Sequence, residues 1–162
     1  MDPLLLVGAA VSTAILGVVA WGRVRAVNPR RVDRWDRAPT LWYGPGIDRI
    51  DIAEALRTWS GLGHVVVLVN DPGADIAVTV DPALGPAGFD ESGDLGVTKV
   101  FVTTDHRIVK VAVRVMPGAD ALVLAHELGH AFGYQHPWFC PTGHLLNPRR
   151  PGWDTRGLEN TP

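Results

Sequence analysis

The sequence predicts a mixed α/β (α+β) domain with five strands and two main helices, preceded by an N-terminal transmembrane helix. Three observations lead to this prediction. Two segments carry apolar residues at a helical period, four short segments are rich in β-branched residues, and the first uncharged stretch is about long enough to span a bilayer. At 162 residues the chain has room for one compact domain and a short appendage.

The N-terminal segment reads "PLLLVGAAVSTAILGVVAWG" and carries no charge from residue 3 to residue 22. Twenty residues at about 1.5 Å each can cross a bilayer core as a helix. Residues 1–22 are therefore predicted to be a transmembrane anchor or a signal segment. The arginines that follow favour a single-pass membrane protein with its C-terminal side in the cytoplasm. Val18-Val19-Ala20 is a passable cleavage site, and its use would instead make the protein secreted.

An arginine-rich linker is predicted for residues 23–39, and its charge contrasts with that of the domain. Residues 1–37 carry a net charge of +3, whereas the rest of the chain carries −5. An acidic domain without a basic stripe argues against nucleic acid as its main partner. Cys140 is the only cysteine, which excludes an intramolecular disulfide and a Cys-x-x-Cys metal or redox site.

The first half of the domain, which spans residues 40–162, is predicted to alternate strands with one helix. Leu41–Tyr43 is a short strand, and apolar residues then recur with a helical period from Ile47 to Ser60, where Gly61 stops the helix. The β-branched run at residues 64–69 predicts a strand buried on both faces. Residues 74–80 predict the next strand.

The second half is predicted to be a hairpin followed by a helix. After a turn-rich loop, residues 96–102 and 108–115 read as two alternating strands. Residues 118–133 read as a helix with Asp120 near its N-terminus, where a negative charge is favourable. This helix is too apolar for a surface position, so we expect it to lie buried beneath the sheet. The chain after Gly133 looks irregular.

Three of the six histidines fall within the eleven-residue stretch "HELGHAFGYQH". His126 and His130 are four residues apart on one helix face, where two imidazoles can bind one Zn²⁺ at about 2.0–2.1 Å each. Gly133 stands where a helix can end at positive φ, and that reversal would bring His136 back as a third ligand. A water molecule would then take the fourth position, and Glu127 faces the side where it could act as general base.

This pattern, His-Glu-x-x-His-x-x-Gly-x-x-His, resembles the zinc-binding motif of the metzincin metallopeptidases. The small glycine-rich domain looks most like the matrixin branch, and the resemblance covers roughly residues 40–148. It implies a twisted, mixed five-stranded sheet whose antiparallel edge strand is the segment 96–102. In that family an extended peptide adds to this strand through main-chain hydrogen bonds. The residues implied at this edge are Val97, Thr98, Lys99 and Val100.

The resemblance also implies a function, a zinc-dependent endopeptidase that holds one catalytic Zn²⁺ and acts on peptide or protein substrates. The family's zinc ligands carry over onto His126, His130 and His136, and its general base onto Glu127. Metzincins place a methionine in a turn beneath the zinc, and Leu146 stands at that position here. The following Asn147-Pro148 resembles the family's continuation, with Pro148 in the supporting turn. Leucine keeps the volume of methionine, so the apolar floor should survive at about 1 kcal/mol of repacking cost.

Two other functions fit the same residues. One is an enzyme that keeps His126 and His130 but takes a downstream carboxylate, Asp154 or Glu159, as third ligand. The other is a zinc-stabilised peptide-binding module that no longer cuts its ligand. The presence of Glu127 argues against this second alternative, and the Leu146 departure argues weakly for it.

Several further polar and aromatic residues give weaker signals. His64, His106 and His144 are expected at the surface, the last as a solvated turn residue. Matrixin-like proteins can hold structural Ca²⁺ in a glycine-rich loop, but the carboxylate spacing at residues 81–94 matches no calcium loop, so a solvated loop is favoured. The four carboxylates concerned are Asp81, Asp90, Glu91 and Asp94. Trp138 and Phe139 are expected either to wall a substrate pocket or to pack in the core.

Overall fold

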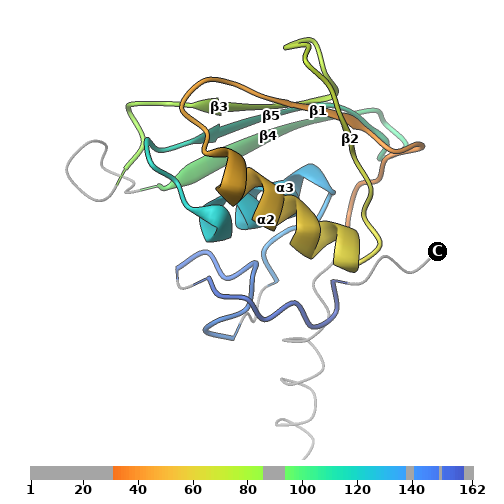
Figure 1. Cartoon of the computed structure of the whole chain (residues 1–162). Coiled ribbons are helices and arrows are strands. Elements are labelled where there is room, and N and C mark those ends of the chain that lie inside the picture. The colour runs from red at the N-terminus through yellow and green to blue at the C-terminus, as the bar shows by residue number, and fades with distance from the viewer. Residues whose placement is uncertain (1–30, 86–93, 138–140, 150, 159–162) are drawn as a thin grey trace, which may run out of the picture.

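The computed structural model describes residues 31–85, 94–137, 141–149 and 151–158. These residues form a five-stranded sheet with two helices on the same side of it, as Figure 1 shows. The elements in chain order are β1 (Thr40–Tyr43), α2 (Arg49–Gly61), β2 (Val67–Leu68), β3 (Ile76–Val80), β4 (Gly96–Val102), β5 (Ile108–Val115) and α3 (Ala121–Ala131). The prediction of a mixed α/β domain with five strands and two helices is confirmed for this part of the chain.

The sheet has the strand order β2-β1-β3-β5-β4. Strands β2, β1, β3 and β5 run parallel, and β4 pairs antiparallel with β5 at the edge. Alternation places Val111, Val113 and Val115 of β5 on the buried face, against the helices. The long antiparallel edge strand expected at residues 96–102 is therefore present, with one side unpaired in the sheet.

Strand β2 differs from its prediction. The run at residues 64–69 was expected to be a strand buried on both faces, but the strand has two residues, and both are exposed. The physical reason is its position, because β2 pairs with β1 at the outer edge of the sheet and no element covers it. A β-branched run reports strand propensity, and it does not report whether the strand is central.

Helix α2 begins after Asp48, whose carboxylate accepts a hydrogen bond of 2.7 Å from the Ile50 N–H. It packs on α3 through a fully buried Trp59, whose indole Nε1 donates to the carbonyl of Ala125 at 2.8 Å. Helix α3 packs against α2 and against strands β4 and β5, and eight of its eleven residues are buried. The expectation of a buried helix beneath the sheet is confirmed.

The segment from residue 141 to residue 158 runs below the helices, on the side away from the sheet (Figure 1). It buries Leu145, Leu146 and Leu158 completely. His144 is buried as well, and both of its ring nitrogens have partners there. Its Nδ1 accepts from the Leu146 N–H at 3.1 Å, and its Nε2 donates to the Arg156 carbonyl at 3.1 Å. The expectation of a solvated His144 was therefore wrong.

A second histidine expected at the surface is also buried. His64 is 4% exposed and lies against the rings of Trp59, Phe132 and Tyr134. Its position at the start of a predicted strand carried no sign of these partners, which lie up to 70 residues away along the chain. The exposed position expected for His106, at the tip of the β4–β5 hairpin, is confirmed.

Some predictions concern residues outside the described ranges. Among the described residues, no helix combines the length and the apolar character needed to cross a membrane. The anchor predicted for residues 1–22 lies outside the described residues, as do residues 23–30 of the linker. The same is true of Asp90, Glu91, Trp138, Phe139, Cys140 and Glu159.

Candidate metal centre

Three imidazoles meet beside helix α3. His126 and His130 project from successive turns of the helix, with ring centroids 5.0 Å apart. The chain then reverses at Gly133, where φ is 92°, and His136 returns to the same place. Each of the three side chains offers a nitrogen, and these nitrogens all lie within 4.8 Å of one another. The predicted grouping of His126, His130 and His136 is present.

Hydrogen bonds at the far side of two rings determine which nitrogen faces the centre. The Nδ1 atom of His126 lies 2.7 Å from the Leu145 carbonyl, and the Nδ1 atom of His130 lies 2.8 Å from the Tyr134 carbonyl. A carbonyl oxygen can only accept, so each Nδ1 carries the hydrogen. The Nε2 lone pairs of both rings are then left for a metal ion, which is the usual arrangement around histidine ligands.

The spacing of the inner nitrogens fits one shared cation. The Nε2 atom of His136 lies 3.1 Å from that of His126 and 3.0 Å from that of His130. Two nitrogens that each lie about 2.1 Å from a tetrahedral zinc ion are about 3.4 Å apart. Since two of the three Nε2 atoms have no hydrogen to donate, the close approach of all three fits a cation ligated by three lone pairs.

The rings are also in the protonation state that a metal requires. Burial lowers the pKa of His126 to about 4, with a further contribution from the neighbouring His130. Burial likewise lowers the pKa of His136 to about 4 and that of His130 below its usual value. All three imidazoles are therefore neutral at pH 7 and able to bind a metal.

Glu127 lies beside the histidines, turned toward the edge strand. Its carboxylate Oε2 accepts a hydrogen bond of 2.6 Å from the hydroxyl of Thr98 on β4. The side chain is 5% exposed, and burial raises its pKa to about 7, although the Thr98 hydrogen bond acts in the opposite direction. A carboxylate with a pKa near neutrality can both take up and release a proton at physiological pH.

A close approach of β4 to Glu127 explains one glycine. A Cβ atom on Gly96 would lie 2.6 Å from Cγ of Glu127, a distance that real Cβ atoms essentially never show. Glycine at this position therefore lets the strand backbone lie directly against the carboxylate side chain. Thr98 was expected on the edge strand, but no local signal in the sequence indicates its bond to Glu127 or the need for glycine at position 96.

An open cleft of about 740 Å³ lies over these groups. The edge strand lines the cleft with Val97 and Thr98, and the segment after α3 lines it with Pro148 and Arg149. Of the four edge residues named from the sequence, Val97 and Thr98 reach the cleft. Lys99 lies against the ring of Phe101, 5.1 Å from its centroid, and Val100 packs against the core.

Leu146 lies in the turn beneath the centre. It is fully buried, and its Cδ2 atom would be 2.5 Å from a Cβ placed on Gly129, so its side chain packs directly on α3 beside His130. The preceding residue, Leu145, supplies the carbonyl that holds His126. The turn therefore packs on α3 through Leu146 and holds His126 through one backbone hydrogen bond.

Of the two carboxylate alternatives for the third ligand, Glu159 lies outside the described residues. Asp154 is bound by Arg156 through both carboxylate oxygens and is not part of the group of three histidines that could hold a metal ion. Asp81 pairs with Arg114, away from the metal centre. A scan against models of protein families finds no match to this chain, and neither does a search among curated proteins.

Proposed function

We propose that this protein is a zinc-dependent endopeptidase of the metzincin type. The observation that carries the proposal is the combination of three neutral imidazoles, whose inner nitrogens converge, with a buried carboxylate at the floor of an open cleft. Histidine nitrogens in this number leave one position of a tetrahedral ion open, which is typical of catalytic rather than structural zinc sites. The identity of the metal is part of the proposal.

The residues have distinct tasks in this proposal. When bound, the zinc ion supplies Lewis acidity, which polarises a peptide carbonyl and makes water more acidic. Glu127 takes a proton from the attacking water and delivers it to the departing amine, so that its carboxylate ends the cycle as it began. Thr98 holds the Glu127 carboxylate in place through its hydroxyl. Leu145 and Tyr134 orient two of the imidazoles through their carbonyls.

The cleft suggests the class of substrate. Strand β4 is paired with β5 on one side, and its other side borders the cleft at Val97 and Thr98. Its unpaired backbone groups can bind an extended peptide as an added strand, which would lie along the row of histidines. A peptide or protein substrate is therefore proposed. The membrane anchor stays a prediction from the sequence of residues 1–22.

The test is cleavage of an unfolded protein mixture by the full-length chain loaded with zinc. Glu127→Gln removes the proton acceptor and keeps the size of the side chain, and Glu54→Gln makes the same change at an exposed position on α2. We expect cleavage by the parent and by Glu54→Gln, and a loss of at least a hundredfold in Glu127→Gln with zinc still bound. His136→Ala should lose zinc as well as activity.

The alternative of a peptide-binding module gives a different pattern. A parent chain that binds one zinc ion and an extended peptide, but cuts no substrate in the mixture, would contradict the proposed peptidase and support the module. A parent chain that holds no zinc at all would contradict both.

A further inference from the structure

Residues 31–37, which we call the N-terminal strap, lie against the end of helix α3. The helix ends at Ala131, and its last carbonyls have no partners within the helix. The strap supplies three donors to this region. Trp35 Nε1 donates to the Ala131 carbonyl at 2.9 Å, Arg31 Nε to the Phe132 carbonyl at 3.1 Å, and the Val32 N–H to the Gly133 carbonyl at 2.9 Å.

These contacts surround the turn that leads to the third histidine. Arg31 forms a β-bridge with Tyr134, and a Cβ on Gly133 would lie 2.0 Å from the Asp33 carbonyl oxygen. The carbonyl of Tyr134 accepts the hydrogen of His130 Nδ1 at 2.8 Å. The strap therefore holds the backbone that orients one histidine and leads the chain to the next.

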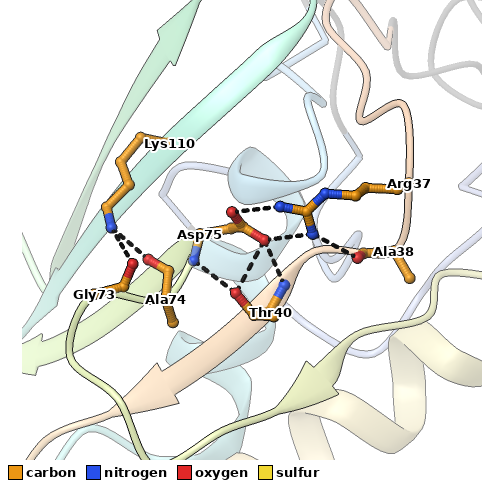
Figure 2. A network of polar contacts seen from close by, with 7 residues as sticks. All are labelled: Arg37, Ala38, Thr40, Gly73, Ala74, Asp75 and Lys110. Atoms are coloured by element: carbon orange, nitrogen blue, oxygen red, sulfur yellow. Dashed lines mark hydrogen bonds and ion pairs between the residues drawn. The ribbon is translucent and has the colours of Figure 1, made fainter.

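The strap is tied down at two further places. Its Asp33 carboxylate lies 3.0 Å from Nδ1 of His106 at the tip of the β4–β5 hairpin. At its other end, Arg37 pairs with Asp75, which also accepts a hydrogen bond from Thr40 at the start of β1 (Figure 2). The strap thus connects the start of the sheet, the hairpin tip and the end of α3.

Hydrogen bonds and the packing of Trp35 against the core hold the strap on the helix end. An open pocket of about 240 Å³ adjoins the strap, lined in part by Trp35, His64 and Phe132. A surface segment beside an open pocket can be released with less loss of core packing than a segment that fills the core. Release would leave the carbonyls of residues 131–133 without their present partners.

We propose that the N-terminal strap is a positioning element of the metal centre, and that its docking and zinc binding stabilise each other. Docking fixes the 131–134 turn, which sets the places of His130 and His136. Zinc, by holding those two side chains, fixes the same turn and so favours the docked strap. The inference rests on the metal site of the proposed function and not on peptide hydrolysis.

The first measurement is the zinc affinity of the full-length chain, determined by competition with a chromophoric chelator. Val32→Pro removes the N–H that donates to Gly133, and Val32→Ala keeps that N–H while shortening the side chain. We expect about tenfold weaker zinc binding in Val32→Pro than in Val32→Ala. Equal affinities in the two folded variants would overturn the proposal while leaving the zinc site intact.

A second pair of variants avoids any change to the backbone. Trp35→Phe removes the indole donor to Ala131, and Trp153→Phe makes the same change at an indole that is 47% exposed. We expect weaker zinc binding in Trp35→Phe alone. The same zinc affinity in both would contradict the proposal even if Val32→Pro failed to fold.

The reciprocal effect is measured by amide hydrogen exchange of the parent chain with and without zinc. Mutual stabilisation requires slower exchange at the Val32 and Asp33 amides when zinc is bound. Unchanged exchange at these amides, with zinc bound, would overturn the proposal and leave the peptidase proposal standing. A parent chain that binds no zinc would overturn both.

Discussion

Helix α3 starts at Ala121 and stops at Ala131, and its two ends obtain their hydrogen-bond partners from different parts of the chain. At the first end, the Asp120 carboxylate accepts from the Val123 N–H at 2.9 Å, three residues away. At the other end, the carbonyls of Ala131 and Phe132 accept from side chains 96 and 101 residues earlier. The first end is capped locally. The other end combines a local turn, in which the Gly133 N–H donates to the His130 carbonyl at 2.9 Å and the Tyr134 N–H to the Gly129 carbonyl at 3.1 Å, with donors from a remote segment.

The difference matters because the two ends have different tasks. The locally capped end starts the helix and carries no metal ligand in its first turn. The remotely completed end is followed within five residues by His136, so a displacement of the backbone there would move a candidate metal ligand. Local capping needs little cooperation from the fold, whereas the far end also needs the docked strap, which requires the assembled domain.

The largest expected effect is a contrast between two glycines, one near each end of α3. In Gly133→Ala, the alanine would have to adopt a φ of 92°, and its Cβ would lie 2.0 Å from the Asp33 carbonyl oxygen. Gly118→Ala has a similar φ of 72° but meets nothing within 4 Å. The free energy of unfolding, measured by urea denaturation, should fall by about 1 kcal/mol in Gly118→Ala and by more than about 3 kcal/mol in Gly133→Ala.

Zinc affinity should separate the two variants further. We expect Gly118→Ala to keep its zinc and Gly133→Ala to lose it, because only the second change displaces the turn that precedes His136. Equal losses of stability, or zinc retained by both, would show that the two ends are not different in the way the structure indicates.

The second-largest effect is expected from low pH, which should destabilise the packing of His64 at the remotely completed end of α3. His64 packs on Phe132 and Tyr134, and burial, followed by the nearby Arg31, lowers its pKa from 6.5 to about 4. The unfolded chain therefore binds the proton first as the pH falls. The stability that comes from neutral His64 is complete above about pH 6.5, falls between pH 6.5 and 4, and is lost below, by about 3 kcal/mol in total.

The measurement is the pH dependence of the free energy of unfolding of the parent and of His64→Gln, both without zinc. His126 and His136 titrate in the same range, but they are shared by both proteins, so the difference between the two curves reports His64. The curves should converge as the pH is lowered from 7 to 4. Parallel curves would contradict the lowered pKa.

The contrast between the two ends of α3 also describes how far the sequence could predict the structure. Helix α3, its N-terminal Asp120 and the three-histidine pattern can each be predicted from a few neighbouring residues, by periodicity, capping and spacing. The turn at Gly133 could be predicted because glycine is favoured at positive φ. These local signals suffice for the identity of the candidate ligands.

What the sequence could not predict depends on contacts between distant residues. The strap was interpreted as part of a charged linker, since nothing in its own residues shows that they bind the end of α3. His64 and His144 were expected at the surface because a histidine carries no local sign of burial. Strand β2 was expected to be buried because its apolar run does not show that it lies at an edge.

A smaller effect is expected at Thr98 of β4, which contacts Glu127 on the side of α3 that faces the sheet. Thr98→Val removes the hydroxyl that donates to Glu127 and keeps the shape of the side chain. If the proposed function holds, kcat should fall about tenfold, on the order of 1.4 kcal/mol, with zinc affinity unchanged. Thr98→Ser retains the hydroxyl and should restore most of the activity, and a Ser variant as slow as the Val variant would count against this positioning role.

The smallest expected effect is at the locally capped end. Asp120→Ala removes the acceptor for the Val123 N–H and should lower the free energy of unfolding by about 1 kcal/mol, with zinc affinity unchanged. Asp48→Ala removes the equivalent cap of α2 and serves as the matched control, with a similar loss. Because α3 is already held along its length by eight buried residues, a frayed first turn should not reach His126. A loss of zinc affinity in Asp120→Ala as large as that in Val32→Pro would mean that both ends of α3 position the metal centre, and that the local cap is as much a part of it as the strap.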